Sequence, residues 1–225
     1  MKPKALFVLM ALSAAALPAA ESAANRLSAA AEVFSDVMST PDKGIPQDLI
    51  AKAQCVVIVP GLKKGAFVIG GEYGKGFAEC RRSGGGWGAP AAVRVEGGSV
   101  GFQIGGSETD VVMLVMNHHG MERLMTDKFT LGADASVAAG PVGRTADAKT
   151  DAAMTAEILA WSRAKGLFAG ISLSGATLRN DLDGNKELYG SRLTNKEIIN
   201  SDRQPPEPAQ KLIAILDKYS IRKEH

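Results

Sequence analysis

Hydrophobic positions near the start of the chain recur at helical spacing. Between Asn25 and Met38, the apolar residues Leu27, Ala31 and Phe34 are three or four positions apart, with charged residues between them. That pattern predicts an amphipathic helix. A short second helix is expected over Gln47 to Ala53, because the proline before it suits the first turn of a helix.

The pattern then changes to β-branched and alternating residues separated by glycine. Cys55 to Val59 is a β-branched run typical of a buried strand, and Pro60-Gly61 is expected to end it. Ser83 to Gly86 has the composition of a hairpin turn. Glycine pairs at 97–98 and 105–106 are expected to separate further strands. The other predicted strands are Gly65–Tyr73, Gly76–Arg82, Trp87–Glu96, Ser99–Ile104, Asp110–Met116, Leu167–Ser174 and Ala176–Arg179.

Helical residue types return mainly outside this region. Gly166 is expected to stop one of these helices at its C-terminal end. Strands cluster in the centre of the chain with helices outside them, and no regular β-α-β alternation is present. This order predicts an α+β domain whose largely antiparallel, Gly-rich sheet is curled toward a barrel and flanked by helices. The further predicted helices are Met121–Thr126, Thr155–Arg163, Asn195–Ser201 and Glu207–Tyr219.

The first residues have the three-part layout of a secretory signal peptide. Lys2 and Lys4 form a basic start, Ala5 to Leu17 is uncharged and apolar, and small residues follow. The apolar run is shorter than the roughly 20 residues of a spanning helix, although an uncleaved anchor stays the alternative. Export predicts a periplasmic or secreted protein. The expected organisation is a signal peptide at 1–23 and a single domain at 24–225, with an N-terminal helical segment at 25–53.

An exported chain meets an oxidising compartment, in which a disulfide persists. Cys55 and Cys80 both lie in or beside predicted strands. A disulfide needs Cα atoms within about 7 Å, which the sequence does not determine. A Cys55–Cys80 disulfide and two separate buried thiols therefore both stay open. The sequence contains neither a CxxC pair nor a Cys/His spacing typical of metal sites.

Composition excludes several functional classes. The 225 residues carry 26 basic and 24 acidic side chains, a net charge of +2, which gives no electrostatic footprint for nucleic acid. Apolar residues make up 45% and charged residues 22% of the chain, close to globular averages. These values exclude a disordered chain and a polytopic membrane protein.

Two motifs that approach enzyme signatures fail. Gly70 to Gly76 has one residue too few between its glycines for a P-loop, so glycine within a twisted sheet is the better interpretation. Gly170 to Ser174 ends in serine where a nucleophile elbow has glycine. A catalytic Ser172 would need His118 or His119 as its base, and nothing in the sequence places them together. We therefore expect no enzymatic activity and no cofactor.

One segment has the spacing of a cation loop. Asp181, Asp183 and Asn185 place oxygen ligands at the 1, 3, 5 spacing that begins a calcium loop. The glycine and glutamate that such a loop has further on are replaced by Lys186 and Arg192. A turn rich in Asp, Gly and Asn explains the segment equally well, so we assign no metal site and keep these residues as a candidate.

Seven motifs occur in order between Ala51 and Ser174. They are Val59-Pro-Gly-Leu-Lys-Lys-Gly65, Gly70-Gly-Glu-Tyr-Gly-Lys-Gly76, Gly86-Trp-Gly-Ala-Pro90, Gly97-Gly-Ser-Val-Gly-Phe-Gln-Ile-Gly105, Thr109-Asp-Val-Val-Met-Leu-Val-Met-Asn117, the Lys128 to Gly143 stretch, and Ser162-Arg-Ala-Lys-Gly-Leu-Phe-Ala-Gly-Ile-Ser172. Together they make the chain similar to the SYLF domain, a lipid-binding family of bacteria and eukaryotes. The strongest similarity covers residues 51–174.

The resemblance implies a non-enzymatic domain that binds phospholipids, and phosphoinositides in eukaryotic members. Some fungal members also bind actin. In eukaryotic relatives an N-terminal amphipathic helix helps to engage membranes, which corresponds here to Arg26 to Met38. The alternative, packing of this helix on the sheet, is favoured because its polar face is not rich in lysine.

The resemblance also implies which residues contact a head group. The intact Pro-Gly-x-Lys-Lys-Gly block makes Lys63 and Lys64 the first candidates, followed by Lys75, Arg81 and Arg82. Cations on one face would attract anionic lipid by roughly 1 kcal/mol each, whereas scattered solvated charge is the alternative. The expected function is phospholipid binding at a membrane surface in the cell envelope. The near-neutral net charge favours the alternative, an envelope structural or protein-interaction module with a protein partner and no lipid ligand.

Overall fold

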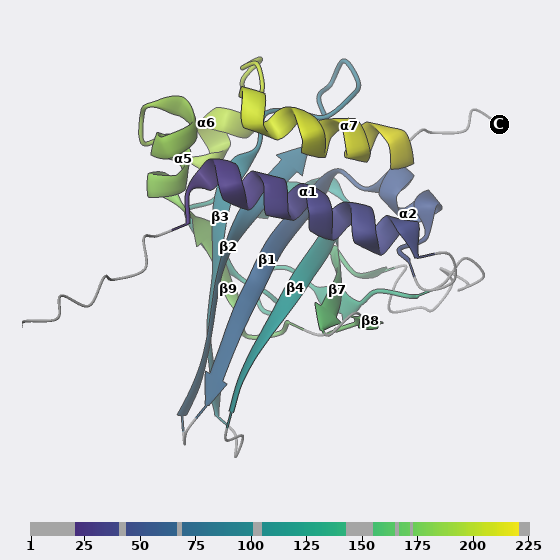
Figure 1. Cartoon of the computed structure of the whole chain (residues 1–225), viewed down its shortest axis with the longest axis vertical. Coiled ribbons are helices and arrows are strands. Elements are labelled where there is room, and N and C mark those ends of the chain that lie inside the picture. Colours follow the sequence, from purple (N-terminus) through teal and green to yellow (C-terminus); the bar gives the residue numbers. More distant parts are fainter. Residues whose placement is uncertain are drawn as a thin grey trace, which may run out of the picture.

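A computed structural model describes residues 21–40, 44–66, 69–100, 105–142, 155–164, 167–171 and 173–220 (Figure 1). Its helices are α1 (Ala23–Ser39), α2 (Gln47–Lys52), α3 (His118–Leu124), α5 (Leu182–Tyr189), α6 (Asn195–Ile199), the 3₁₀ helix η1 (Glu207–Ala209) and α7 (Gln210–Tyr219). Its strands are β1 (Cys55–Ala66), β2 (Ile69–Cys80), β3 (Ala91–Val100), β4 (Gly105–Val115), β5 (Lys128–Thr130), β6 (Val137–Ala139), β7 (Ile158–Ala164), β8 (Leu167–Gly170) and β9 (Thr177–Asn180).

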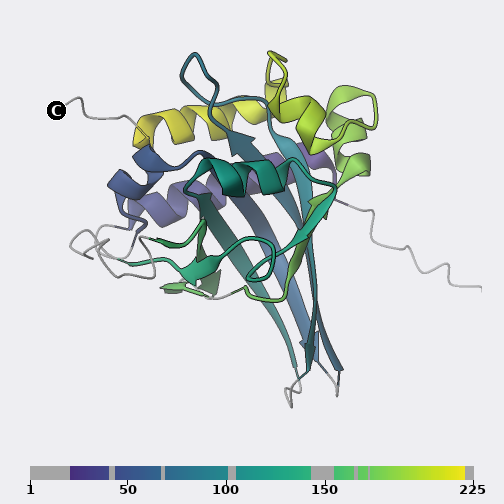
Figure 2. The same ribbon diagram turned by 180° about the vertical axis from the view of Figure 1, so that it is seen from behind.

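The strands form one strongly curled sheet. Eight of the nine strands among the described residues follow the order β5-β9-β3-β2-β1-β4-β7-β6, and the ninth, β8, pairs with β7 outside this path. All of these pairings are antiparallel except that of β6 with β7. The long strands β1 to β4 project together beyond the rest of the molecule (Figures 1 and 2). The prediction of an α+β fold with a largely antiparallel, half-barrel sheet and flanking helices is confirmed.

Two layers of apolar side chains cover the two faces of this sheet. On one side, which we call the helix face, Val56, Ile58 and Phe77 pack against α1 and α7. On the other side, Val57 and the alternating residues of the neighbouring strands form a second core, to which Leu124 of α3 belongs. Successive residues of a strand point to opposite faces, so the sequence alternation determines which side chains each core receives.

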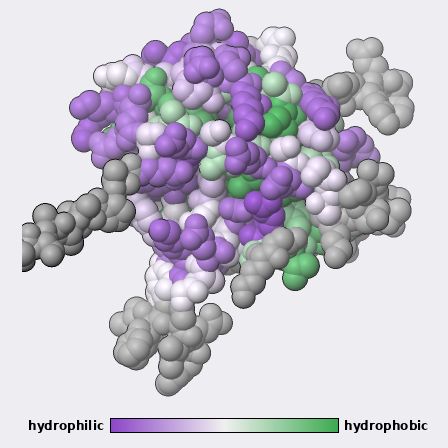
Figure 3. Space-filling model, in the orientation of Figure 1, coloured by the Kyte–Doolittle hydropathy of each residue, from purple (hydrophilic) through white to green (hydrophobic). Residues whose placement is uncertain are grey.

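The helix α1 packs on the sheet, as the favoured alternative predicted. Ser22 caps its first turn by accepting a hydrogen bond from the Asn25 backbone N–H at 3.2 Å. Its apolar side chains, including Leu27 and Phe34, are buried in the core of the helix face. The surface over α1 and α7 is mainly hydrophilic (Figure 3). None of the described helices is long and apolar enough to cross a membrane.

Several predicted strand ends are wrong. Pro60-Gly61 does not stop β1, which continues through a bulge between Val59 and Leu62. Gly61 adopts a φ of 57° there, a conformation that favours glycine. The glycine pairs at 97–98 and 105–106 lie inside or at the start of strands instead of between them. Pairing with neighbouring strands thus outweighs the local tendency of proline and glycine to end a strand.

The predicted helix over Thr155 to Arg163 is also wrong, since most of this segment forms β7. Ile158 to Trp161 are all buried, and β7 is paired with β4, β6 and β8. Ser83 to Gly86 connects β2 to β3 as predicted, with positive φ at two of its glycines. Residues 1–20, which hold most of the predicted signal peptide, and Ser172 lie outside the described residues.

Candidate anion-binding site

Arg81 is occupied within the protein, although the sequence made it a candidate for lipid contact. Its guanidinium group donates to the backbone carbonyl of Ala53 at 2.9 Å and to that of Ile50 at 3.1 Å, near the end of α2. It also lies 4.4 Å from the centre of the Trp87 ring. These contacts satisfy carbonyl groups that a helix leaves free at its C-terminal end. Arg81 therefore serves the fold.

The other predicted cations do not form one cluster. Arg82 donates to the carbonyl oxygen of Arg203 at 3.0 Å. Lys64 forms an ion pair with Glu72 at 3.0 Å. Lys63 and Lys64 are consecutive in β1 and so point to opposite faces of the sheet. Only one residue of this pair can face a given membrane surface.

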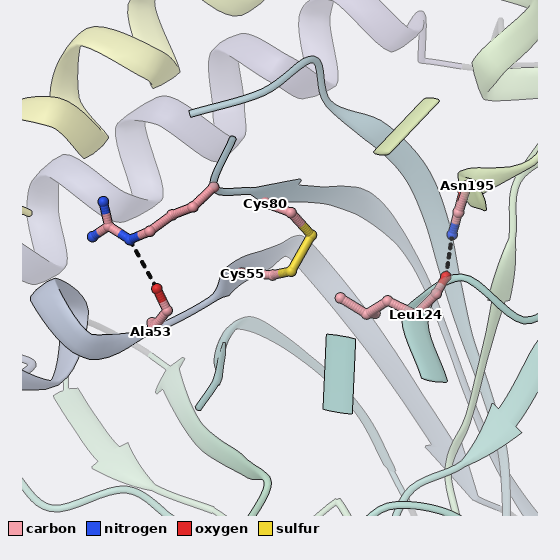
Figure 4. Close-up of a disulfide and its surroundings, with 6 residues drawn as sticks. Ala53, Cys55, Cys80, Leu124 and Asn195 are labelled. Carbon is pink, nitrogen blue, oxygen red and sulfur yellow. Dashed lines mark hydrogen bonds between the residues drawn. A yellow bond between two sulfur atoms is a disulfide. The ribbon is translucent and has the colours of Figure 1, made fainter. Parts of the chain in front are cut away.

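Cys55 and Cys80 form a disulfide between directly paired positions of β1 and β2 (Figure 4). Their Cα atoms are 4.0 Å apart. This distance, which the sequence did not determine, is within the limit of about 7 Å for a disulfide. Both residues are buried in the core opposite the helix face. The bond therefore joins the ends of the two central strands close to Ala53 and Leu124 (Figure 4).

Four basic side chains lie directly opposite one another across neighbouring strands. Lys75 of β2 pairs with Arg94 of β3, Arg94 with Arg179 of β9, and Arg179 with Lys128 of β5. Paired residues share a face, and Phe77, two positions after Lys75, belongs to the core of the helix face. We call these four residues the cation ladder. Because strands lie about 4.8 Å apart, the ladder is roughly 14 Å long.

Carboxylates neutralise part of the ladder. Glu96 lies 2.8 Å from Arg94 and 3.0 Å from Arg179, and the buried Asp181 lies 2.9 Å from the Nζ of Lys75. Lys128 has no carboxylate within ion-pair distance among the described residues. Like charges directly opposite one another destabilise a sheet. The four cations of the ladder thus have two carboxylate partners, and two further carboxylates, Glu72 and Asp134, line the hollow beside Arg179 and Lys128.

Two hollows adjoin the ladder. One of about 510 Å³ lies beside Arg179 and Lys128; it is lined also by Thr130 and Thr177, and by carboxylates as well as cations. The other, of about 360 Å³, brings Lys75 together with Lys63 of β1 and Arg26 of α1. The exposed Tyr73 lines both hollows.

Sequence reasoning missed most of this arrangement. Lys75 was a candidate, but Arg94, Arg26, Arg179 and Lys128 were not selected. Each of these cations stands alone in its segment of the sequence. Only the strand register places Arg179 and Lys128 beside Arg94 and Lys75. The available signal was the alternation of the strands, which places these cations on one face once the pairing is known.

The candidate cation loop is engaged in other contacts. Asp181 pairs with Lys75, and Asp183 lies 2.6 Å from Arg192. The Asn185 side chain accepts from the Ala92 backbone N–H at 2.7 Å. Most of the segment belongs to α5, so the expected turn is a helix. The described residues contain no group of three His, Cys, Asp or Glu side chains placed to hold a metal ion.

His118 and His119 lie in the first turn of α3. His118 lies 3.6 Å from Glu122, and His119 contacts Glu157. Burial acts to raise the pKa of Glu157, but hydrogen bonds from His119 and Ser136 outweigh it and lower the pKa below its ordinary value. His119 therefore contacts the carboxylate of Glu157, the residue that precedes β7.

Comparison with known proteins identifies the family. The sequence profile of the Ysc84 family, described as "Las17-binding protein actin regulator", matches residues 96–219, more than half of the chain. The chain belongs to the Ysc84 (SYLF) family. The matched residues include Lys128 and Arg179 of the cation ladder and begin just after Arg94. The resemblance drawn from the seven motifs is therefore confirmed.

Curated relatives are eukaryotic proteins of greater length. The chain is 32% identical over 183 residues to "LAS seventeen-binding protein 3" of Saccharomyces cerevisiae, covering 80% of this chain and 40% of that protein. It is 34% identical over 187 residues to "SH3 domain-containing YSC84-like protein 1" of Xenopus laevis, covering 82% and 55%. The human protein of the same name is 31% identical over 195 residues, covering 85% and 57%. The chain thus spans about half the length of these relatives.

Proposed function

We propose that this protein is a non-enzymatic module that binds anionic phospholipid at a membrane surface, with lipid phosphates lying along the cation ladder. The observation that carries the proposal is the direct pairing of Lys75, Arg94, Arg179 and Lys128 across four strands. Such a row costs stability in the free protein, and phosphate groups would remove that cost.

The ladder gives this function a defined surface without a large net charge. The chain as a whole carries only +2. A local row of cations attracts anionic lipid over about a Debye length, which is roughly 10 Å at 0.1 M salt. The whole molecule therefore needs no basic excess, and its binding is expected to fall as salt is added.

We further propose that the protein acts in the cell envelope after export, as a periplasmic or secreted protein bound peripherally to the membrane. The Cys55–Cys80 disulfide supports this compartment, because disulfides persist in oxidising environments and are rare in the cytosol. The basic, apolar and small-residue order of the first 23 residues supports it independently.

The test is cosedimentation with vesicles of phosphatidylcholine alone or mixed with phosphatidylglycerol, at low and high salt. We expect binding only to the mixed vesicles and weaker binding at high salt. The double variant Arg179→Gln/Lys128→Gln removes half of the ladder. At about 1 kcal/mol per cation, its affinity should fall roughly 30-fold at low salt.

A matched control variant distinguishes binding at the cation ladder from a general attraction between the protein's positive charge and the membrane. Lys52→Gln/Lys196→Gln removes the same charge from exposed positions on α2 and α6. Its affinity should stay within about twofold of the wild type. An equal loss in both double variants would contradict the ladder as the site, and absence of binding to the mixed vesicles would contradict lipid binding altogether.

A protein partner is the second candidate function, and a free sheet edge favours it. β9 pairs with β3 only along Val93–Glu96, so the described strands leave the outer edge of Gly97–Val100 unpaired. An extended peptide can add to such an edge through main-chain hydrogen bonds. The names of the relatives, which include a "LAS seventeen-binding protein", point the same way. In the cell envelope the partner would be another envelope protein.

A further inference from the structure

A cavity of about 360 Å³ opens beside the first turn of α1, at the Lys75 end of the cation ladder. We call it the α1 cavity. Four elements bring charged side chains to it, namely α1, the bulged part of β1, β2 and α5, together with Glu21 shortly before α1. The charged residues that line it are Glu21, Arg26, Lys63, Lys75 and Glu187.

Arg26 is buried in the wall of this cavity with part of its guanidinium group unused. The residue is 6% exposed. Its Nη2 donates to the Glu21 carbonyl oxygen at 2.7 Å, and its Nε lies 3.8 Å from a Glu21 carboxylate oxygen. Its Nη1 has no hydrogen-bond partner among the described residues. A buried donor on a charged group is costly to leave unpaired, which points to an acceptor supplied by a ligand.

Lys63 is the second uncommitted cation. It is exposed at the rim of the cavity and has no carboxylate within ion-pair distance among the described residues. Lys75, in contrast, is already paired with Asp181 at 2.9 Å. Arg26 and Lys63 therefore form the part of the cavity that can accept an anion.

The same cavity contains two carboxylates. Glu187 accepts a hydrogen bond from the Ala23 backbone N–H at 2.6 Å through one oxygen, which leaves its second oxygen available. Glu21 has a side chain that is 56% exposed. A simple anion would be repelled by both carboxylates. A ligand that carries an ammonium group close to its anionic group would instead pair with cations and carboxylates together.

We infer that the α1 cavity binds a phosphoethanolamine group, with the phosphate against Arg26 and Lys63 and the primary ammonium against Glu187. Glu21 belongs to the first 23 residues, which export is expected to remove, so it is not assigned to the site. A primary ammonium can donate hydrogen bonds to the Glu187 carboxylate, whereas the trimethylammonium of choline has no N–H to donate. Where the group belongs to a phospholipid, the inference rests on the proposed function and adds a head-group preference to it.

Soluble head groups test the cavity without a membrane. Calorimetric titration of the full chain compares glycerophosphoethanolamine, glycerophosphocholine and inorganic phosphate. We expect the ethanolamine compound to bind at least tenfold more tightly than the other two. Equal affinity for all three, or no binding of the ethanolamine compound, would overturn the inference.

Variants test which residues contact the phosphate and which contact the ammonium group of the ligand. Lys63→Gln should weaken binding of glycerophosphoethanolamine about tenfold. We choose Lys63 for this test because it is exposed, whereas Arg26 is buried and its replacement would also affect folding. Glu187→Gln should abolish the preference for ethanolamine over choline. The Lys52→Gln variant, at an exposed position of α2 that does not line the cavity, is the control and should bind like the wild type. A preference that survives in Glu187→Gln would contradict the assigned contacts.

Vesicles distinguish a lipid from a soluble source of the group. With a constant fraction of phosphatidylglycerol, the remaining lipid is either phosphatidylethanolamine or phosphatidylcholine. Stronger binding with the ethanolamine lipid, lost in Glu187→Gln, supports a lipid ligand. A preference only for the soluble compound supports a soluble phosphoethanolamine ligand. If phosphatidylglycerol vesicles bind but neither assay shows an ethanolamine preference, the cavity inference fails while the proposed function stands.

Discussion

Arg81 lies between the end of α2 and the ring of Trp87, where its charge is used within the protein. Arg81→Ala removes hydrogen bonds to the carbonyls of Ala53 and Ile50. Such bonds from a charged donor contribute roughly 1.5–3 kcal/mol, so the free energy of unfolding should fall by about 3 kcal/mol. Urea unfolding measures this change. Vesicle binding of the folded variant should be unchanged, and a selective loss of lipid affinity with normal stability would return Arg81 to the binding site.

Glu79 makes stability depend on pH. It is 1% exposed in the core under α7, and neither carboxylate oxygen has a hydrogen-bond partner among the described residues. Burial, together with the nearby Asp217, raises the pKa of Glu79 well above its ordinary value. The folded protein therefore keeps this proton at pH values where the unfolded chain has lost it. Stability is greatest below the unfolded pKa and falls as pH rises toward the folded pKa.

Glu79→Gln keeps the size of the side chain and removes its charge. The free energy of unfolding of the wild type should fall by at most about 1.4 kcal/mol per pH unit through this group, and that part of the slope should vanish in the variant. Urea unfolding between pH 4 and pH 8 measures both slopes. Parallel curves for the two proteins would show that Glu79 is ionised to the same extent in the folded and unfolded states.

At the scale of elements, the sequence predicted the curled antiparallel sheet and the outer helices because alternation and helical spacing are local signals. It failed for β7, whose residue types also suit a helix, because the pairing with β4 and β6 is non-local. It also ended β1 at Pro60-Gly61, where a bulge lets the strand continue. The cation ladder needed the register itself, since a shift of one residue would move Arg179 to the other face.

The pairing of β1 with β2 is reinforced by the Cys55–Cys80 disulfide, which closes a loop of 25 residues. In the loop-entropy account, a loop of this length contributes about 3.5 kcal/mol. Cys55→Ala/Cys80→Ala should therefore lower the free energy of unfolding by about that amount, as measured in urea without reductant. Wild type treated with reductant in its unfolded state serves as the matched comparison. An unchanged urea midpoint would mean that the bond is not formed in the protein that is measured.

In the whole molecule, α1 links the sheet to the remaining helices. Leu27 and Phe34 have no exposed surface. Arg163 of β7 holds α1 through Asp36 at 2.5 Å and holds β4 through Asp110 at 2.9 Å. Insertion of α1 into a membrane would expose the apolar residues beneath it on the helix face. The ladder and the α1 cavity require no such movement, because both are reached with α1 in place.

Hydrogen exchange of the α1 backbone amides, with and without phosphatidylglycerol vesicles, distinguishes docked from inserted α1. We expect the amides around Leu27 and Phe34 to stay protected in both conditions, because the docked helix shares the stability of the core. Phe34→Ala, which should cost about 3–5 kcal/mol, provides a protein whose α1 is released more easily. If vesicles accelerated exchange in α1 of the wild type, or if Phe34→Ala bound vesicles more tightly, α1 would have to leave the sheet during binding. Unchanged protection and affinity would place lipid binding on the folded surface formed by α1, β2, β3, β9 and β5.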